Sequence, residues 1–279
     1  MVQKLRNLTE KYAILSAVAI AIVFYAIMQG VTFIFSILPS STGMDYLRHI
    51  VGILYPIGIV YLFGFSSAFK AGGFKKTLIC GMFMLVIQLI SLINSIVEKA
   101  SSNETAWQPW YIVILGVVTV ISIGIREECV FRATIQGVLA KKYASSRKGI
   151  LLTALLSAII FGLIHALNVF KGVEPLSALV QAVTNIGVGM FLAAIYLRCG
   201  NMWALALIHA ITDASGLFNA LFCKNLSTVE AISSLSMSSL IIGAVFFLIG
   251  LYMLRPSKCK GIIERFSTEP EVQSADAAT

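Results

Sequence analysis

The sequence predicts an all-α protein, a polytopic transmembrane bundle of about eight helices. Of its 279 residues, 58% are hydrophobic and only 12% are charged, whereas soluble domains are typically about 45–50% apolar and about 25% charged. The mean hydropathy of +0.89 points the same way. Apolar runs of about 20 residues, enough helix to cross a ~30 Å hydrocarbon core, recur along the chain between charged connections.

Eight such runs define the expected spans. The first is too long for the apolar region of a signal peptide and no cleavage site is marked, so we expect it to be retained. Trp107, Trp110 and Trp203 lie near the ends of runs, where amphipathic rings favour the membrane interface. The runs cover residues 13–38, 49–69, 77–97, 110–132, 149–169, 176–197, 202–222 and 235–254.

These spans divide the chain into five parts and no internal repeat is visible. The polar stretch after Arg265 is predicted to be disordered, because it has too little apolar surface to form a core. The parts are a cytoplasmic N-terminus (1–12), three N-terminal spans (13–109), a core of spans with the candidate site (110–222), a last span (223–254) and a basic, then disordered, cytoplasmic tail (255–279).

The basic residues alternate from connection to connection, which predicts the orientation. Four lie on one side: Arg48, Lys99, Lys171 and Lys224. Fifteen lie on the other: Lys4, Arg6, Lys11, Lys70, Lys75, Lys76, Lys141, Lys142, Arg147, Lys148, Arg198, Arg255, Lys258, Lys260 and Arg265. The positive-inside rule therefore places both termini in the cytoplasm of a multi-pass plasma-membrane protein. The net charge of +8 is then a topology signal with some attraction to anionic lipid, and we expect no nucleic-acid partner.

Few ionisable groups fall within the spans. Of 13 acidic residues only Glu127, Glu128 and Asp213 do so, and of three histidines His165 and His209 lie well inside. A charge at the centre of a spanning helix costs about 2.5–3.5 kcal/mol on insertion scales, so such groups mark functional sites by default. A structural ion pair would explain one of them alone, but hardly a set on three spans.

Helical phase gives the two adjacent glutamates different roles. Glu128 and Arg132 are four residues apart, about 40° around an α-helix, with the acid first, which favours an ion pair. Glu127 lies on another face and is not neutralised in this way. A carboxylate at low dielectric has a raised proton affinity, so Glu127 is predicted to be free to act as a general base.

The two intramembrane histidines each have a neighbour one turn away. Phe161 and His165 share a face, with Asn168 one turn further, and His209 and Asp213 are again four residues apart. A functional histidine usually needs its second ring nitrogen held, and we expect Asp213 to hold that of His209. At about 1.5 Å per residue, the two histidines lie roughly 24 Å and 10 Å into their spans, so they converge only if a helix tilts or starts late.

Three patterns in this order, E-E-x-x-x-R, F-x-x-x-H and H-x-x-x-D, resemble the CAAX-protease and bacteriocin-processing family, also called Abi or CPBP, over residues 110–222. The resemblance implies an intramembrane endopeptidase in which Glu127 and His165 activate water, while His209 and Asp213 stabilise the oxyanion. Glu128, Arg132, Phe161 and Asn168 would support the site. The chain departs from the family at Ala133, often Gly, and at Asp213, often Asn. An ionised carboxylate cannot donate to an oxyanion, so Asp213 must be protonated or must orient His209.

Other readings of the same residues remain. We expect a site without a cofactor, and the alternative is zinc bound by Glu127, His165 and His209, since two histidines, a glutamate and water form a known zinc arrangement. The H-E-x-x-H signature is absent. Cys129 as a nucleophile is disfavoured against simple packing. A non-enzymatic alternative is a transporter or bacteriocin immunity protein whose acids relay protons, although no inverted repeat supports it.

The expected partners follow from this setting. They are membrane lipid and a membrane-associated substrate, either prenylated or a plain peptide. Many bacterial members of the family it resembles are linked to peptide maturation or bacteriocin self-immunity, but no residue here selects one substrate or an oligomeric state.

Overall fold

The computed structural model describes residues 2–70, 72–101, 106–224 and 226–267. Within these ranges the chain forms helices and no β-strand, and only an isolated antiparallel bridge joins Trp107 to Cys223. The predicted all-α class is confirmed. The polar end predicted to be disordered begins inside the last helix, and its residues from 268 onward lie outside the described part of the chain.

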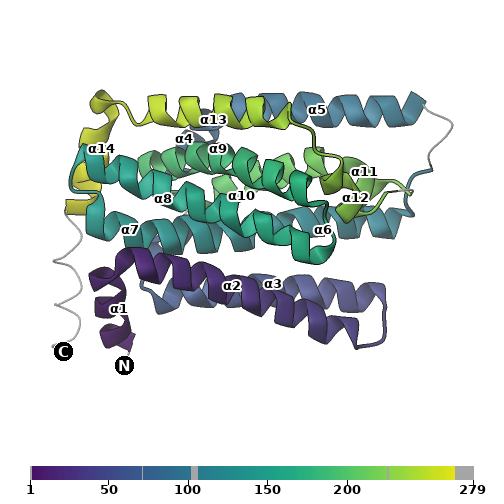
Figure 1. Cartoon of the computed structure of the whole chain (residues 1–279), viewed down its shortest axis with the longest axis horizontal. Helices are drawn as coiled ribbons and strands as arrows, with labels where there is room; N and C mark the ends of the chain where they lie inside the picture. Colours follow the sequence, from purple (N-terminus) through teal and green to yellow (C-terminus); the bar gives the residue numbers. More distant parts are fainter. Residues whose placement is uncertain (1, 71, 102–105, 225, 268–279) are drawn as a thin grey trace.

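The long helices run side by side along one axis (Figure 1). The first half contains α1 (Val2–Lys11), α2 (Ala13–Ser36), α3 (Thr42–Leu62), η1 (Ser66–Phe69), α4 (Phe74–Cys80), α5 (Met82–Ser101) and α6 (Trp110–Glu127). The second half contains η2 (Glu128–Ile135), α7 (Gln136–Tyr143), α8 (Arg147–Ala166), η3 (Leu167–Lys171), α9 (Pro175–Cys199), α10 (Met202–Gly216), α11 (Phe218–Phe222), α12 (Thr228–Ser233), α13 (Ser239–Met253) and α14 (Pro256–Ser267).

Helix α9 is the central element and packs against both α8 and α13. Glu174 caps its first turn, and Gly200, with a left-handed φ of 73°, ends it. It crosses α13 so closely that a Cβ on Gly187 would overlap the Gly243 carbonyl, and a Cβ on Gly243 would press against the backbone of Thr184 in α9. Small residues let membrane helices approach in this way and gain dispersion contacts along their length.

Among the described residues, four helices are long and apolar enough to cross a membrane: α2, α5, α8 continued into η3, and α9. The bent pair α13 and α14, which turns by 71°, makes a fifth if it counts as one span. The third expected span breaks at Gly81 between α4 and α5, and the seventh ends at Gly216, after only 15 residues of α10. The count of eight therefore remains a prediction.

Helices α1, α7 and α14 lie together at one end of the bundle (Figure 1). Basic side chains at this end form contacts between the connecting segments. Arg6 donates to the carbonyls of Tyr61 and Leu62 at the end of α3, both at 2.9 Å. Lys141 pairs with Glu10 at 3.4 Å. The connections expected to be cytoplasmic thus meet at a common end, which is the arrangement that the basic asymmetry requires.

Reporter fusions test this orientation. Reporters fused after Lys70 and after Arg265 should both indicate the cytoplasm, and one fused after Ser101 should indicate the opposite side. The reason is the fifteen-to-four distribution of basic residues between the two sides of the membrane. A reporter after Lys70 and one after Ser101 that appear on the same side would exclude α5 as a span.

Candidate active site

The paired glutamates lie at the start of a π-helical segment. Helix α6 passes without a break into η2, a π-helix of 8 residues that are all buried, and then into α7. The Thr134 hydroxyl donates to the Cys129 carbonyl at 2.9 Å, which gives one of the widened turn's carbonyls a side-chain partner. The regular α-helix expected through residue 132 is therefore wrong after Glu127. Such π-helical insertions are frequent at functional sites because they re-aim side chains.

The expected ion pair between Glu128 and Arg132 is present in this segment. Arg132 Nε lies 3.3 Å from Glu128 Oε2, and both side chains are fully buried. The contact is an ion pair outside hydrogen-bond geometry, and the other two guanidinium nitrogens have no hydrogen-bond partner among the described residues. The guanidinium instead stacks over the Phe161 ring, 4.6 Å from its centroid, a favourable cation–π contact.

A close helix crossing brings α10 to the glutamates. Gly124 in α6 lies so near the backbone of α10 that a Cβ there would overlap the Ala206 carbonyl oxygen. One turn beyond each of these residues lie Glu128 and His209, so the crossing places their side chains opposite one another. Asn201 fixes the start of α10 by accepting from the Ala204 amide at 2.9 Å.

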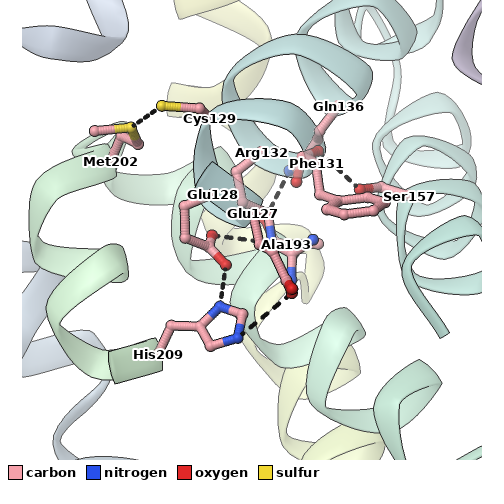
Figure 2. Close-up of polar contacts among 10 residues, drawn as sticks. All are labelled: Glu127, Glu128, Cys129, Phe131, Arg132, Gln136, Ser157, Ala193, Met202 and His209. Atoms are coloured by element: carbon pink, nitrogen blue, oxygen red, sulfur yellow. Dashed lines mark hydrogen bonds and ion pairs between the residues drawn. The ribbon is translucent and has the colours of Figure 1, made fainter. Parts of the chain in front are cut away.

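Glu128, rather than Asp213, holds His209. The Nδ1–H of His209 donates to Glu128 Oε1 at 2.8 Å, and Figure 2 shows the ring lying between the two glutamates. The expectation that Asp213 would hold the second ring nitrogen is thus wrong. Asp213 Oδ2 lies 3.8 Å from Nε2, on the other side of the ring, because the neighbouring helix approaches Nδ1 more closely than the next turn of α10 does.

The Nε2 edge of His209 faces two carboxylates without a hydrogen bond to either. Glu127 Oε2 lies 3.7 Å away and Asp213 Oδ2 3.8 Å away. Both oxygens are buried and have no hydrogen-bond partner among the described residues. Buried polar atoms are usually paired, so two unpaired acids beside one imidazole nitrogen outline a place for a reacting polar group.

His165 has a defined tautomer. A carbonyl can only accept, so the contact of 2.8 Å between His165 Nδ1 and the Phe161 carbonyl oxygen places the proton on Nδ1. In the neutral imidazole, Nε2 then carries the lone pair. The Phe161 ring contacts both histidines, with centroid distances of 4.8 Å to His165 and 5.9 Å to His209. The two histidines therefore converge as the sequence required.

A cavity of about 440 Å³ collects most of the predicted residues. Its lining includes Glu127, His165, Asn168, His209 and Asp213, whereas Glu128 and Arg132 lie behind it, outside the lining. The polar and charged side chains that line it and were not assigned a role from the sequence are Arg48, His49, Thr119, Arg126, Lys171, Gln181 and Thr228, with Gln29 and Thr32.

Two of these polar residues had a signal in the sequence. Arg126 is an intramembrane charge beside the glutamates, and Gln181 is an amide within an apolar run. The Asn168 side chain donates to Gln181 Oε1 at 2.8 Å, which joins η3 to α9 at the cavity wall. Asn168 thus has a partner on a neighbouring helix that no short sequence motif would reveal.

The alternative chemistries find less support in the geometry. No group of three or more His, Cys, Asp or Glu side chains among the described residues is arranged to hold a metal ion, and His209 Nδ1 is engaged by Glu128. The Cys129 thiol is fully buried and points at Met202 Sδ, 3.2 Å away, outside the cavity lining. Its surroundings are those of a packed apolar side chain.

The comparisons with known proteins agree with the motifs. The comparisons with curated proteins and with solved structures gave no match. Residues 108–215 match the family model described as type II CAAX prenyl endopeptidase Rce1-like. This segment runs from just before α6 to the end of α10, so it contains both glutamates, Arg132 and both histidines. Over this segment the chain is similar to the type II CAAX prenyl endopeptidases described as Rce1-like.

Proposed function

We propose that this protein hydrolyses a peptide bond near the C-terminus of a prenylated CAAX-type substrate, with water activated by Glu127 and His165 and without a metal. One observation carries the proposal: a buried carboxylate oxygen of Glu127 that forms no hydrogen bond lies on the wall of a cavity that two histidines also line. A general base must reach the water it deprotonates and must not be neutralised by a salt bridge. Glu127 lines the cavity and forms no salt bridge with an arginine or lysine, since Arg132 pairs with Glu128; its nearest basic atom is His209 Nε2, 3.7 Å away.

His165 shares the activation of water. Because its Nδ1–H is committed to the Phe161 carbonyl, the Nε2 lone pair can accept a hydrogen bond from the same water. Glu127 takes a proton as the water oxygen attacks the carbonyl carbon. The tetrahedral intermediate then collapses, the C–N bond breaks, and the proton passes to the leaving amine. Two acceptors on one water both orient its lone pair and raise its nucleophilicity.

His209 is suited to stabilise the oxyanion. Glu128 fixes the imidazole through Nδ1–H, and in the doubly protonated ring Nε2–H also faces the cavity as a preorganised donor, the kind of group that stabilises developing charge. Asp213 Oδ2 lies 3.8 Å from Nε2 and forms no hydrogen bond, which favours a donor role for Asp213 over an orienting role through His209. Asp213 contributes to the oxyanion in its protonated form, because an ionised carboxylate has no proton to donate.

The experiment is a cleavage assay on purified protein in detergent, with an S-farnesylated CAAX peptide as substrate and mass spectrometry as readout. Cleavage should persist after exhaustive treatment with a zinc chelator, because the proposed base and donors are side chains of this chain. The Glu127→Gln protein, purified in parallel, controls for contaminating proteases. Loss of activity on chelation, with recovery on adding zinc, would favour the Glu127, His165 and His209 zinc site; no cleavage of any peptide would refute the proposed function.

A further inference from the structure

The cavity contains basic residues that the proposed chemistry does not use. Arg48, Arg126 and Lys171 all line it, on α3, α6 and η3 respectively. Arg48 pairs with Asp45 at 3.3 Å, and Lys171 lies over the Tyr25 ring, 5.8 Å from its centroid. Three cations from three elements thus line the same cavity as Glu127.

Arg126 is the least satisfied of these cations. Its Nε is buried with no hydrogen-bond partner among the described residues, and no acidic oxygen in the described chain lies within the 4.0 Å limit of an ion pair with it. Its Nη1 lies over Gly52 of α3, 3.8 Å from where a Cβ would stand. The Glu127 and Asp213 carboxylates act on its charge only from beyond ion-pair distance. A guanidinium in a low-dielectric site without a direct ion-pair partner is costly, so an anion that enters the cavity would gain a strong partner.

A second cavity shows from which direction a substrate would reach Arg126. It measures about 340 Å³ and is lined by residues of α5, α8, α9, α10, α12 and α13, and it shares His165, His209 and Asp213 with the first. Its polar lining is otherwise uncharged, as Gln88 and Asn185 illustrate, and it contains no Lys or Arg. A chain that extends through both cavities would therefore pass the histidines and reach basic residues at one end only.

We propose that Arg126, with Arg48 and Lys171 beside it, binds the free C-terminal carboxylate of the peptide substrate and so makes cleavage depend on a nearby chain end. This inference rests on the proposed function. A guanidinium binds a carboxylate through paired, charge-assisted N–H···O hydrogen bonds, which add both affinity and direction. Binding the carboxylate holds the peptide in register, with the bond to be cleaved beside Glu127. Arg126 is then a specificity-determining residue, while Glu127 and the histidines perform the chemistry.

The test compares one S-farnesylated peptide as free acid and as C-terminal amide, with the wild type and with Arg126→Gln. The wild type should cleave the acid with a kcat/KM roughly 10- to 100-fold above that of the amide, the range expected for hydrogen bonds to a charged group. In Arg126→Gln, kcat/KM for the free-acid peptide should fall to about the value for the amide peptide. Arg126→Lys keeps the charge but loses the paired hydrogen bonds. Its preference for the acid over the amide should lie between those of the wild type and Arg126→Gln. Arg147→Gln, on the exposed first turn of α8, is the control and should keep the wild-type preference.

The outcomes separate the two proposals. Equal cleavage of acid and amide by the wild type refutes the carboxylate site but leaves the proposed function standing, and this comparison does not depend on whether any variant folds. Cleavage of neither peptide refutes the function itself. The assay is repeated in neutral detergent with and without anionic phospholipid. A defect of Arg126→Gln that appears only with that lipid, for acid and amide alike, would assign Arg126 to a lipid phosphate and overturn the inference.

Discussion

Replacing Glu127 by Gln is expected to abolish peptide hydrolysis while leaving the protein folded. Glutamine has nearly the same shape but cannot take a proton from water, and loss of a general base typically costs about 10²–10⁴-fold in rate. The fold should survive because Glu127 Oε2 forms no hydrogen bond and its nearest charged neighbour, His209 Nε2, lies 3.7 Å away. The measurements are kcat on the prenylated peptide and thermal unfolding, both in detergent.

Glu98→Gln is the matched control, since Glu98 is an exposed acid on α5, a membrane-spanning candidate, remote from the cavity lining. It should keep both activity and thermal stability. If Glu127→Gln remains active while Glu128→Gln folds normally and is inactive, the roles of the two glutamates are reversed. The assignment of the base by helical phase would then be wrong.

Local periodicity was enough to predict the different positions of the two glutamates. The four-residue spacing of Glu128 and Arg132 led to the expected ion pair, and Glu127 lies in the cavity lining from which Glu128 is absent. This prediction succeeded although Glu128 and Arg132 both lie in the π-helical segment, because residues four apart on this wider helix still lie on nearly the same face. The π-helix itself had no visible signal, since it depends on how the widened turn packs against its neighbours.

Contacts between helices were beyond such reasoning. The sequence offered Asp213, one turn away on the same helix, as the partner of His209. The structure instead has Glu128 there, because Gly124 lets α6 approach the backbone of α10. A glycine within an apolar run does not reveal which helix it meets. The depth difference between the two histidines is likewise resolved by packing, with the Phe161 ring in contact with both.

The second large effect is on stability, and it should be unequal for the two members of the ion pair. Glu128→Gln leaves Arg132 fully buried without its ion-pair partner, with the Phe161 ring beside the guanidinium and the Glu127 carboxylate beyond ion-pair distance. An uncompensated buried charge costs about 3–5 kcal/mol. Arg132→Gln should cost less, because Glu128 keeps the Nδ1–H of His209 as a partner at 2.8 Å. Thermal unfolding and folded yield in detergent should therefore rank the wild type first, then Arg132→Gln, then Glu128→Gln.

The double variant Glu128→Gln/Arg132→Gln distinguishes this explanation from a simple loss of packing. It removes the lone cation, and the new amide oxygen at position 128 can still accept from His209, so the double variant should recover part of the stability that Glu128→Gln loses. Loss of packing alone predicts the opposite, because two altered buried side chains should then cost at least as much as one. A double variant that unfolds at or below the temperature of Glu128→Gln would show that the unpaired charge of Arg132 is not what destabilises the single variant.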